Sequence, residues 1–186
     1  MLAAGSSSRM GRPKQLLSHN GKSLLENTVD TANDAEANPV IVVLGANAEL
    51  LENIVVEKKV HIVENKEWKE GMASSIRCGL HTLLHIAPSS DAVIIMVCDQ
   101  PFVSASLLND LIATQKKTGK PIVTSHYENT MGPPALFYKT IFPELLELKG
   151  DAGARKIVER HNNDTATVLF TQGVIDIDTE ADYKAL

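Results

Sequence analysis

The chain has 186 residues, of which 44% are hydrophobic and 22% charged, and its formal net charge is −5 at pH 7. This length suits one domain with a sizeable core, and the mild acidic balance disfavours general binding to nucleic acid or membrane surfaces. No apolar run approaches the roughly 18 residues of a membrane span, and the opening stretch lacks the features of a signal peptide. We therefore expect one cytoplasmic domain over residues 1–186, with Cys78 and Cys98 as reduced thiols.

Short, β-rich apolar runs recur along the chain, with helical patterns between them. The predicted strands are 39–44, 60–63, 92–97, 121–123, 167–170 and 174–177. The predicted helices begin at the capping-box pattern Ser23–Glu26, follow the apolar stripe Ile76, Leu80, Leu83 and Leu84, cover 104–117 and 154–161, and run from Thr179 to Leu186. Continuous apolarity indicates strands that are covered on both faces. The alternation predicts an α/β fold with a doubly wound, mostly parallel, Rossmann-like sheet.

Polar segments follow three of the predicted apolar runs. The loop from Gly5 to Lys14 comes directly after Leu2–Ala4, Asp99 follows 92–97, and Asp178 follows 174–177. In a parallel α/β sheet, ligands bind beyond the carboxyl ends of the strands. We therefore expect these three segments to meet at one site.

The first of these segments is rich in glycine, serine and basic residues. Backbone amides in such a turn can bind phosphate oxygens, while Arg9 can bind two oxygens at once and Lys14 supplies a point charge. The segment is not a P-loop, because the first glycine of that motif falls on Leu16, and it also lacks the dinucleotide fingerprint. The alternative interpretation is a solvated basic loop.

The two acidic residues indicate a metal site. Asp99 and Asp178 would converge if the segments before them end at the same edge of the sheet, and carboxylates are ligands that Mg²⁺ prefers. A magnesium ion there would offset the repulsion between an anionic acceptor and a triphosphate. From the residues alone, a simple turn at Asp99–Pro101 is an equally good interpretation.

The segment Leu2–Gly11, with Pro13–Lys14 and Leu16–Leu17, resembles the N-terminal signature of nucleotidyltransferases with the MobA-like fold. Within that family it most resembles the molybdenum cofactor cytidylyltransferases, the MocA type. Four further resemblances follow in chain order and extend over most of the chain. They are Gly71–Arg77 to the segment that reads the nucleobase, Cys98–Pro101 to the metal-binding turn, Gly132–Phe137 with Gly150–Arg155 to the acceptor side, and Asp176–Thr179 followed by Asp182–Tyr183 to the second metal-binding turn.

The resemblance implies a Mg²⁺-dependent enzyme that joins CMP from CTP to a molybdopterin-type cofactor and releases pyrophosphate. It implies that Leu2, Ala3, Ala4 and Gly5 present their backbone to base and ribose, that Arg9 and Lys14 hold the phosphates, and that Ser74 lies near the base. Lys14, Arg9 and Asp99 would be catalytic, and Asp99 and Asp178 would bind Mg²⁺. The acceptor side would be Gly132, Pro133, Pro134, Gly150 and Asp151. A recipient molybdoenzyme or its insertion chaperone is the protein partner that this reaction suggests.

Two features depart from the family pattern. Only Met1–Ala4 precede Gly5, whereas a typical strand has about five residues, so either the first strand is shortened or the start of the natural protein is missing from this chain. Pro133 stands where relatives often carry histidine or another polar residue. Trp68, just before Gly71, is either a core residue or a shield for the base.

Two other functions remain open. The first is a guanylyltransferase or a sugar- or polyol-phosphate nucleotidyltransferase, because fold alone does not separate these activities. The pair Ala3–Ala4 favours cytidine by resemblance, since guanylyl relatives tend to carry a second glycine there. The second is a non-catalytic carrier or chaperone that binds nucleotide or molybdenum cofactor without turnover.

Overall fold

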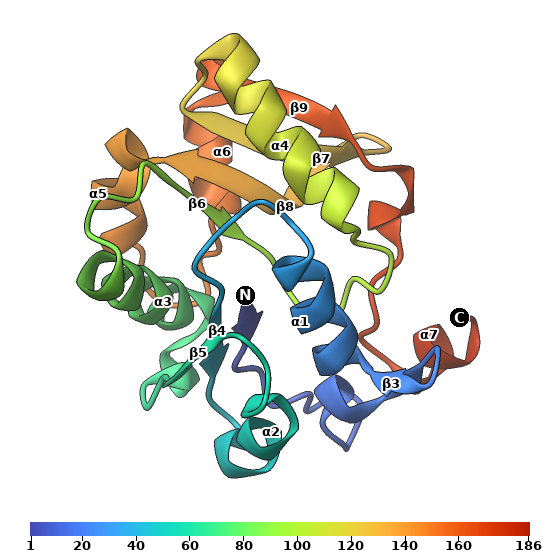
Figure 1. Cartoon of the computed structure of the whole chain (residues 1–186). Helices are drawn as coiled ribbons and strands as arrows, with labels where there is room; N and C mark the ends of the chain where they lie inside the picture. The colour runs from blue at the N-terminus through green and yellow to red at the C-terminus, as the bar shows by residue number, and fades with distance from the viewer.

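The structure is a computed structural model that describes residues 1–186, and Figure 1 shows its elements. The strands are β1 Leu2–Ala3, β2 Ser18–His19, β3 Lys22–Ser23, β4 Ile41–Leu44, β5 His61–Glu64, β6 Ala92–Ile95, β7 Ile122–Tyr127, β8 Thr130–Tyr138 and β9 Thr165–Leu169. The α-helices are α1 Leu24–Asn33, α2 Ala48–Val55, α3 Met72–Ile86, α4 Ala105–Thr118, α5 Phe142–Leu146, α6 Arg155–Arg160 and α7 Glu180–Lys184. The 3₁₀ helices are η1 Lys14–Leu16, η2 Trp68–Glu70, η3 Lys139–Ile141, η4 Asn162–Asp164 and η5 Thr171–Val174.

The strands form two ladders that meet at the start of the chain. One ladder has the order β1-β4-β5 and is parallel throughout. The other has the order β6-β8-β7-β9, in which β8 runs antiparallel to both of its neighbours. A parallel bridge between Leu2 and Val97 joins them. The predicted mostly parallel sheet is confirmed, and β1 has 2 residues.

Helices cover both faces of this sheet, as the continuous apolar strands predict. On one face, α3, α5 and α6 pack against β4, β7 and β8 in a cluster that contains Ile76, Phe137 and Ile157. On the other face, α1 and α2 pack on β4, and α4 packs on β7 and β8. Figure 1 shows the N-terminal end in the middle of the molecule and the C-terminal helix α7 beside β3. No helix combines the length and apolarity needed to cross a membrane.

Local signals for helix starts are confirmed. Ser23 and Glu26 form the expected capping box at α1, and Ser104 caps α4 by accepting from the Leu107 N–H. Thr179 caps α7 through a capping box with Asp182, although this helix ends at Lys184 rather than at Leu186.

The predicted strand at 174–177 is wrong. Its first residue ends η5, and the rest is extended backbone outside any ladder. Val174 and Ile175 are exposed, and only Ile177 is buried. The apolar run therefore does not form a strand, and its one buried side chain fixes the segment to the rest of the protein. The Ile177 N–H donates to the Asp99 carbonyl oxygen at 2.9 Å, which fixes this segment beside the turn after β6.

Several elements were not expected from the sequence, among them β8, α2 and α5. The longest strand, β8, contains Gly132, Pro133 and Pro134, which are residues typical of turns. Thr124 pairs with Ala135 and Ser125 with Gly132, so Pro133 and Pro134 are left without partners in β7. Helices α2 and α5 were also missed, since both are short and lack a capping signal of the kind found at Ser23.

Candidate active site

A cleft of about 430 Å³ lies where the chain leaves β1. Leu2, Ala3, Ala4, Gly5 and Ser6 form one side of it, and the start of α3 with Trp68 forms another. Lys14 and Asp99 line its end, and Asp151 lines it next to Gly71. The opening loop and the turn after β6 therefore meet at one cavity, as expected for the carboxyl edge of a parallel sheet.

Gln15 holds the opening loop in shape. Its side chain is buried, and Nε2 donates to the carbonyl oxygens of Ala3 at 3.0 Å and Gly5 at 2.9 Å. The Ser7 hydroxyl oxygen accepts from the Lys14 N–H at 3.0 Å. Because both residues bind the loop from within, the loop leaves β1 in a defined path and sends Lys14 back toward the sheet.

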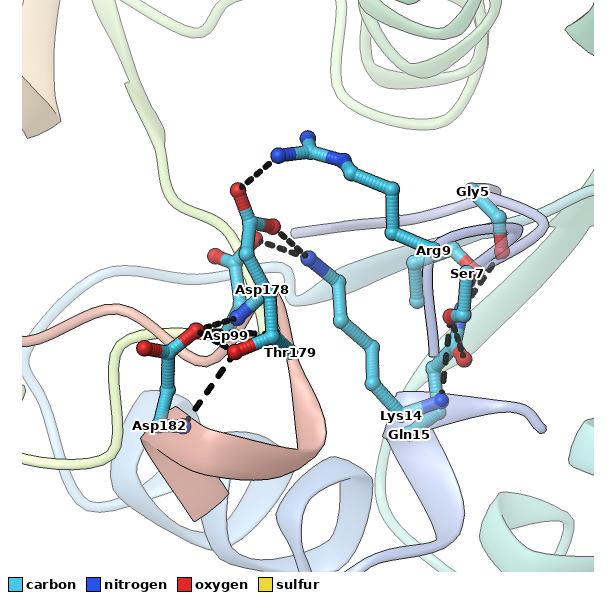
Figure 2. Close-up of polar contacts among 10 residues, drawn as sticks. Gly5, Ser7, Arg9, Lys14, Gln15, Asp99, Asp178, Thr179 and Asp182 are labelled. Atoms are coloured by element: carbon cyan, nitrogen blue, oxygen red, sulfur yellow. Dashed lines mark hydrogen bonds and ion pairs between the residues drawn. The ribbon is translucent and has the colours of Figure 1, made fainter. Parts of the chain in front are cut away.

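Four charged side chains converge at the end of the cleft, as Figure 2 shows. Lys14 Nζ lies 2.5 Å from Asp99 Oδ2 and 3.1 Å from Asp178 Oδ1. Arg9 Nη1 lies 3.0 Å from the other oxygen, Asp178 Oδ2. The Lys14 side chain is 15% exposed whereas that of Arg9 is 72% exposed, so the lysine is fixed in the cluster and the arginine is free to rearrange.

The C-terminal segment supplies Asp178 through its own set of contacts. Asp182 Oδ2 accepts from the Asp178 N–H at 3.2 Å, the Thr179 N–H at 2.7 Å and the Thr179 hydroxyl at 2.8 Å. Ile177 packs with Leu17 and Leu24, close to the end of the opening loop. The buried Ile177 and the capping box of α7 together orient the Asp178 carboxylate toward Lys14.

The cluster favours a charged lysine. Burial by itself would lower the pKa of Lys14, but the attraction and hydrogen bond of Asp99, and then those of Asp178, outweigh it and raise the pKa. Lys14 therefore stays an ammonium group at neutral pH. An ammonium group held between two carboxylates at the end of a cleft can bind a phosphate once a ligand engages those carboxylates.

Asp176 gives a test of this electrostatic environment. Burial, and then the carboxylates of Asp178 and Asp99, raise the pKa of Asp176. When a carboxyl group has a higher pKa in the folded state than in the unfolded state, the free energy of unfolding of the protein falls as pH rises from the unfolded pKa through the folded one. The charge of Asp176 therefore opposes folding at pH 7. We expect Asp176→Asn to raise the melting temperature by about 1–2 °C at pH 7, measured by differential scanning calorimetry. The difference should vanish below the ordinary pKa of 3.8, and a gain that persists there would contradict this cause.

The start of α3 is held by a buried polar network. Asn65 Nδ2 donates to the hydroxyl oxygens of Ser74 at 2.8 Å and Ser75 at 3.0 Å. The Ser74 hydroxyl lies within hydrogen-bond distance of the carbonyl oxygens of Glu67 at 2.9 Å and Gly71 at 2.8 Å. Ser74 thus joins Asn65 and the turn before α3, whereas Ser75 lines the cleft.

Gly71 is required by the close approach of another chain segment. It has φ +110°, and a Cβ at this position would lie 2.6 Å from the carbonyl carbon and oxygen of Gly150 and would also clash with Asp151. The Ala73 N–H donates to the Gly150 carbonyl oxygen at 3.1 Å, so the two segments are fixed to each other here.

We expect Gly71→Ala to destabilise the protein by about 2–4 kcal/mol, because backbone strain and overpacking add. The melting temperature should fall by about 5–15 °C, measured by circular dichroism. Gly119→Ala is the matched control, since Gly119 also has positive φ but no atom lies within 4 Å of its Cβ position. Equal losses in the two variants would show that the contact with Gly150 has no effect.

The structure distributes the predicted site residues unevenly. Leu2, Ala3, Ala4, Gly5, Lys14, Asp99 and Asp151 line the cleft. Arg9 and Asp178 join it through the ion pairs with each other and with Lys14. Gly150 lies behind Gly71, and Ser74 lies beneath the start of α3. Gly132, Pro133 and Pro134 belong to β8 and do not line this cleft. The roles assigned to these residues stay predictions.

Several residues of the site were missed or left open. Trp68 lines the cleft, which places an aromatic ring at its wall, and Met72 and Ser75 line it as well. Gln15 supports the loop from a buried position. A glutamine between Lys14 and the apolar pair Leu16–Leu17 is the signal that could have pointed to this role.

The carboxylates fit a divalent metal ion. Asp99 and Asp178 are close enough to bind the same ammonium group, so their oxygens can reach one small cation, and carboxylate oxygens are suitable ligands for Mg²⁺ and Mn²⁺.

A cleft at the carboxyl edge of a parallel sheet, with cations beside paired carboxylates, has the charged groups that a nucleotidyltransferase needs to position two anions. The chain belongs to the family of the MobA-like NTP transferase domain, whose model matches residues 1–165. This confirms the family that the motifs predicted.

The chain is also similar to curated relatives and to solved structures over most of its length. The chain is 29% identical to the purine catabolism protein PucB of Bacillus subtilis, over 98% of this chain and 91% of the relative. It is 31% identical to nicotine blue oxidoreductase of Paenarthrobacter nicotinovorans, over 83% of this chain and 78% of the relative. The crystal structure of Rv0371c from Mycobacterium tuberculosis is similar with a TM-score of 0.85 at 30% identity, covering 99% and 93% of the two chains. A complex of Rv0371C with manganese has a TM-score of 0.81 at 28% identity, covering 100% and 94%.

Proposed function

We propose that this nucleotidyltransferase transfers CMP from CTP to a molybdopterin-type cofactor in the cytoplasm and releases pyrophosphate. The observation that carries the proposal is the convergence of Lys14, Asp99 and Asp178 at the end of a cleft whose side is the backbone of Leu2–Gly5. An acceptor phosphate oxygen attacks the α-phosphorus of the nucleotide, and the bond to pyrophosphate breaks. The chemistry consists mainly of positioning two anions and stabilising charge.

Different residues around the cleft would bind the base and ribose, the phosphates and the metal ion. The backbone of Leu2–Gly5 and the wall at Trp68 and Ser75 receive the base and ribose. Lys14 binds a phosphate oxygen from within the cleft, and the exposed Arg9 leaves Asp178 to bind the triphosphate from outside. Asp99 and Asp178 would hold Mg²⁺, which, when bound, offsets the charge of the departing pyrophosphate.

The manganese complex of Rv0371C supports a divalent metal in this family, and Mg²⁺ is our proposal for this chain. The choice of CTP rests on the Ala3–Ala4 pair, since both residues line the cleft and Ala4 is packed tightly beside Gly45. A side chain at this position leaves less room for a purine than a glycine would.

The acceptor is proposed to approach from the side of Asp151. This residue lines the cleft and lies on the segment that packs against Gly71. Gly150, Gly132, Pro133 and Pro134 would contact the part of the acceptor that extends beyond the cleft. A recipient molybdoenzyme or its insertion chaperone would take up the product.

The reaction is tested by measuring pyrophosphate release from CTP, GTP, ATP and UTP with Mg²⁺, with and without molybdopterin cofactor. Release from CTP that depends on the cofactor is the expected result. Cofactor-dependent release from GTP instead of CTP would show that GTP is the nucleotide substrate and would overturn the proposed choice of base. Release with a sugar or polyol phosphate as the only effective acceptor would overturn the proposed acceptor and keep the transferase class.

Trp68 supplies an independent measure of binding. It is the only tryptophan in the sequence and it lines the cleft, so nucleotide binding should change its fluorescence. CTP titrations with Mg²⁺ should give a saturable change that is lost in Trp68→Phe. Binding without turnover for any acceptor would favour a carrier over an enzyme.

A further inference from the structure

The outer part of the opening loop, residues 8–13, belongs to no strand and no helix. Its side chains form two ion pairs, and both go to the C-terminal segment. Arg9 Nη1 lies 3.0 Å from Asp178 Oδ2, a contact that Figure 2 shows. Arg12 Nη2 lies 3.0 Å from Glu180 Oε2. The outer loop is therefore attached by charge to the same segment that carries Asp178.

Arg12 makes the more specific of these two contacts. Its Nη2 donates to both carboxylate oxygens of Glu180, each at 3.0 Å. Its guanidinium carbon also lies 5.7 Å from the centre of the Tyr183 ring, which is within the range of a cation–π interaction. Glu180 and Tyr183 are three residues apart on α7, so they lie on the same side of that helix. Arg12 thus binds one side of α7 through two different interactions.

Tyr183 attaches α7 to the chain on the other side of Lys14. Its hydroxyl donates to the Ser18 carbonyl oxygen at 2.8 Å, and its ring packs beside the apolar cluster that buries Ile177. Arg12 precedes Lys14 in the chain and Ser18 follows it. Helix α7 is therefore tied to the opening loop before Lys14 and to the strand β2 after it.

The attachment of Arg12 to α7 does not depend on the cleft. Asp178 binds Arg9 and Lys14, and in the proposed function Arg9 leaves it to bind the triphosphate. That step removes one of the two ion pairs of the outer loop. Neither Arg12 nor Glu180 lines the cleft, so their contact can persist while a ligand enters. It would keep the loop on α7 at the moment when Arg9 changes partner.

The exposure of the pair indicates where its effect should be measured. The side chains of Arg12 and Glu180 are 52% and 46% exposed, and an exposed ion pair contributes little to folding stability. A loop that has to be ordered when its ligand binds, however, lowers the affinity by the cost of that ordering. The contact should therefore affect nucleotide binding more than the melting temperature.

We propose that Arg12 is a positioning residue of the nucleotide site, which docks the outer part of the opening loop on α7. Arg9 and Asp178 then approach the triphosphate and the metal ion as one unit. Arg12 does not touch the ligand and acts through the position of Arg9. The inference rests on the proposed function, because it concerns the binding of a triphosphate.

The test compares Arg12→Met, Glu180→Gln and the double variant. Isothermal titration calorimetry with CTP and Mg²⁺ should show about 10-fold weaker binding for each single variant, and no further loss in the double variant, since both remove one contact. KM for CTP should rise in parallel, while kcat and KM for the acceptor stay within about twofold. Asp91→Asn is the matched control, because Lys139 pairs with Asp91 at 2.8 Å and lies over the Tyr138 ring, away from the cleft.

A direct contact between Arg12 and the triphosphate gives a different pattern. Glu180→Gln removes a negative charge near an anionic ligand, so it would then bind CTP as tightly as the unmodified chain or more tightly. That result would overturn the proposal. A fall in kcat with an unchanged KM for CTP in both single variants would also overturn it.

A second measurement needs no nucleotide. Trypsin can cut the outer loop after Arg9, whereas Pro13 blocks cleavage after Arg12. Without ligand, Glu180→Gln should speed the cut after Arg9 about fivefold, measured by mass spectrometry, and Asp91→Asn should not. Equal rates in Glu180→Gln and the unmodified chain would overturn the proposal. If the unmodified chain does not bind CTP, the proposed function fails, and the trypsin comparison still decides whether Arg12 docks the loop.

Discussion

Replacing Lys14 with methionine lowers kcat/KM for nucleotidyl transfer by about 100- to 1000-fold, which is the usual effect of removing one preorganised charge from an anionic transition state. Lys14 is held by two carboxylates and is 15% exposed, so its ammonium group is already fixed at the end of the cleft. Methionine keeps an unbranched stem that reaches about as far as lysine Cε and removes the charged amino group. Steady-state pyrophosphate release, with CTP and acceptor varied in turn, measures the loss.

Lys22→Met is the matched control. Lys22 also binds a carboxylate, with Nζ 2.7 Å from Asp30 Oδ2, but it lies in the hairpin of β2 and β3 and does not line the cleft. This variant should keep the activity of the unmodified chain. A Lys14→Met protein with full activity would contradict the phosphate role of Lys14.

The Lys14→Met variant should lose activity but gain affinity for a divalent metal ion. Asp99 and Asp178 both bind the Lys14 ammonium group, so a divalent cation competes with it for their oxygens. We expect Lys14→Met to bind Mn²⁺ about 10-fold more tightly than the unmodified chain in the absence of nucleotide, because a competing contact of about 1.4 kcal/mol is gone. Titration followed by electron paramagnetic resonance measures free Mn²⁺ directly. Weaker binding by the variant would show that the lysine supports the metal site rather than competing for it.

The sequence predicted well those parts of the fold that depend on local signals. The strands β4, β5, β6 and β9 follow from short apolar runs, and α1 and α4 follow from their serine caps. The same reasoning failed at β8, where two prolines lie within the longest strand. The pairing with β7 skips both prolines, and such an irregularity depends on long-range pairing that no local pattern reports.

The residues of the site also divide into those that local sequence signals predict and those that only the fold brings together. Lys14 and Asp99 could be predicted, because one ends a basic loop and the other follows an apolar run. The position of Asp178 was predicted for a wrong reason, since its segment is no strand and is fixed by Ile177 and the α7 cap. Trp68 remained undecided between core and cleft, because its place depends on the turn before α3. The Ser74 hydroxyl faces Asn65, and only the fold brings these residues together.

The second large effect concerns the two carboxylates. Asp99→Asn should lower kcat/KM by about 1000-fold, and Asp178→Asn should lower it by a similar factor, because each removes a charged metal ligand. Asparagine keeps the shape of the side chain, and the backbone bond from Ile177 to the Asp99 carbonyl oxygen is untouched. Each substitution also removes a carboxylate partner of the Lys14 ammonium group, so we expect the melting temperature to fall, and activity is measured well below that temperature so that unfolding does not cause the loss.

The double variant distinguishes a shared metal from two separate roles. If both carboxylates bind one ion, removing the second after the first costs little more, so the effects of the two substitutions should be far from additive. Separate roles would multiply the two losses to about a millionfold. Asp30→Asn is the matched control, since Asp30 also binds two lysines, Lys22 at 2.7 Å and Lys58 at 2.6 Å, away from the cleft. Mn²⁺ binding should be lost in both single variants and kept in Asp30→Asn, and retention of Mn²⁺ by Asp99→Asn would assign the metal to other ligands.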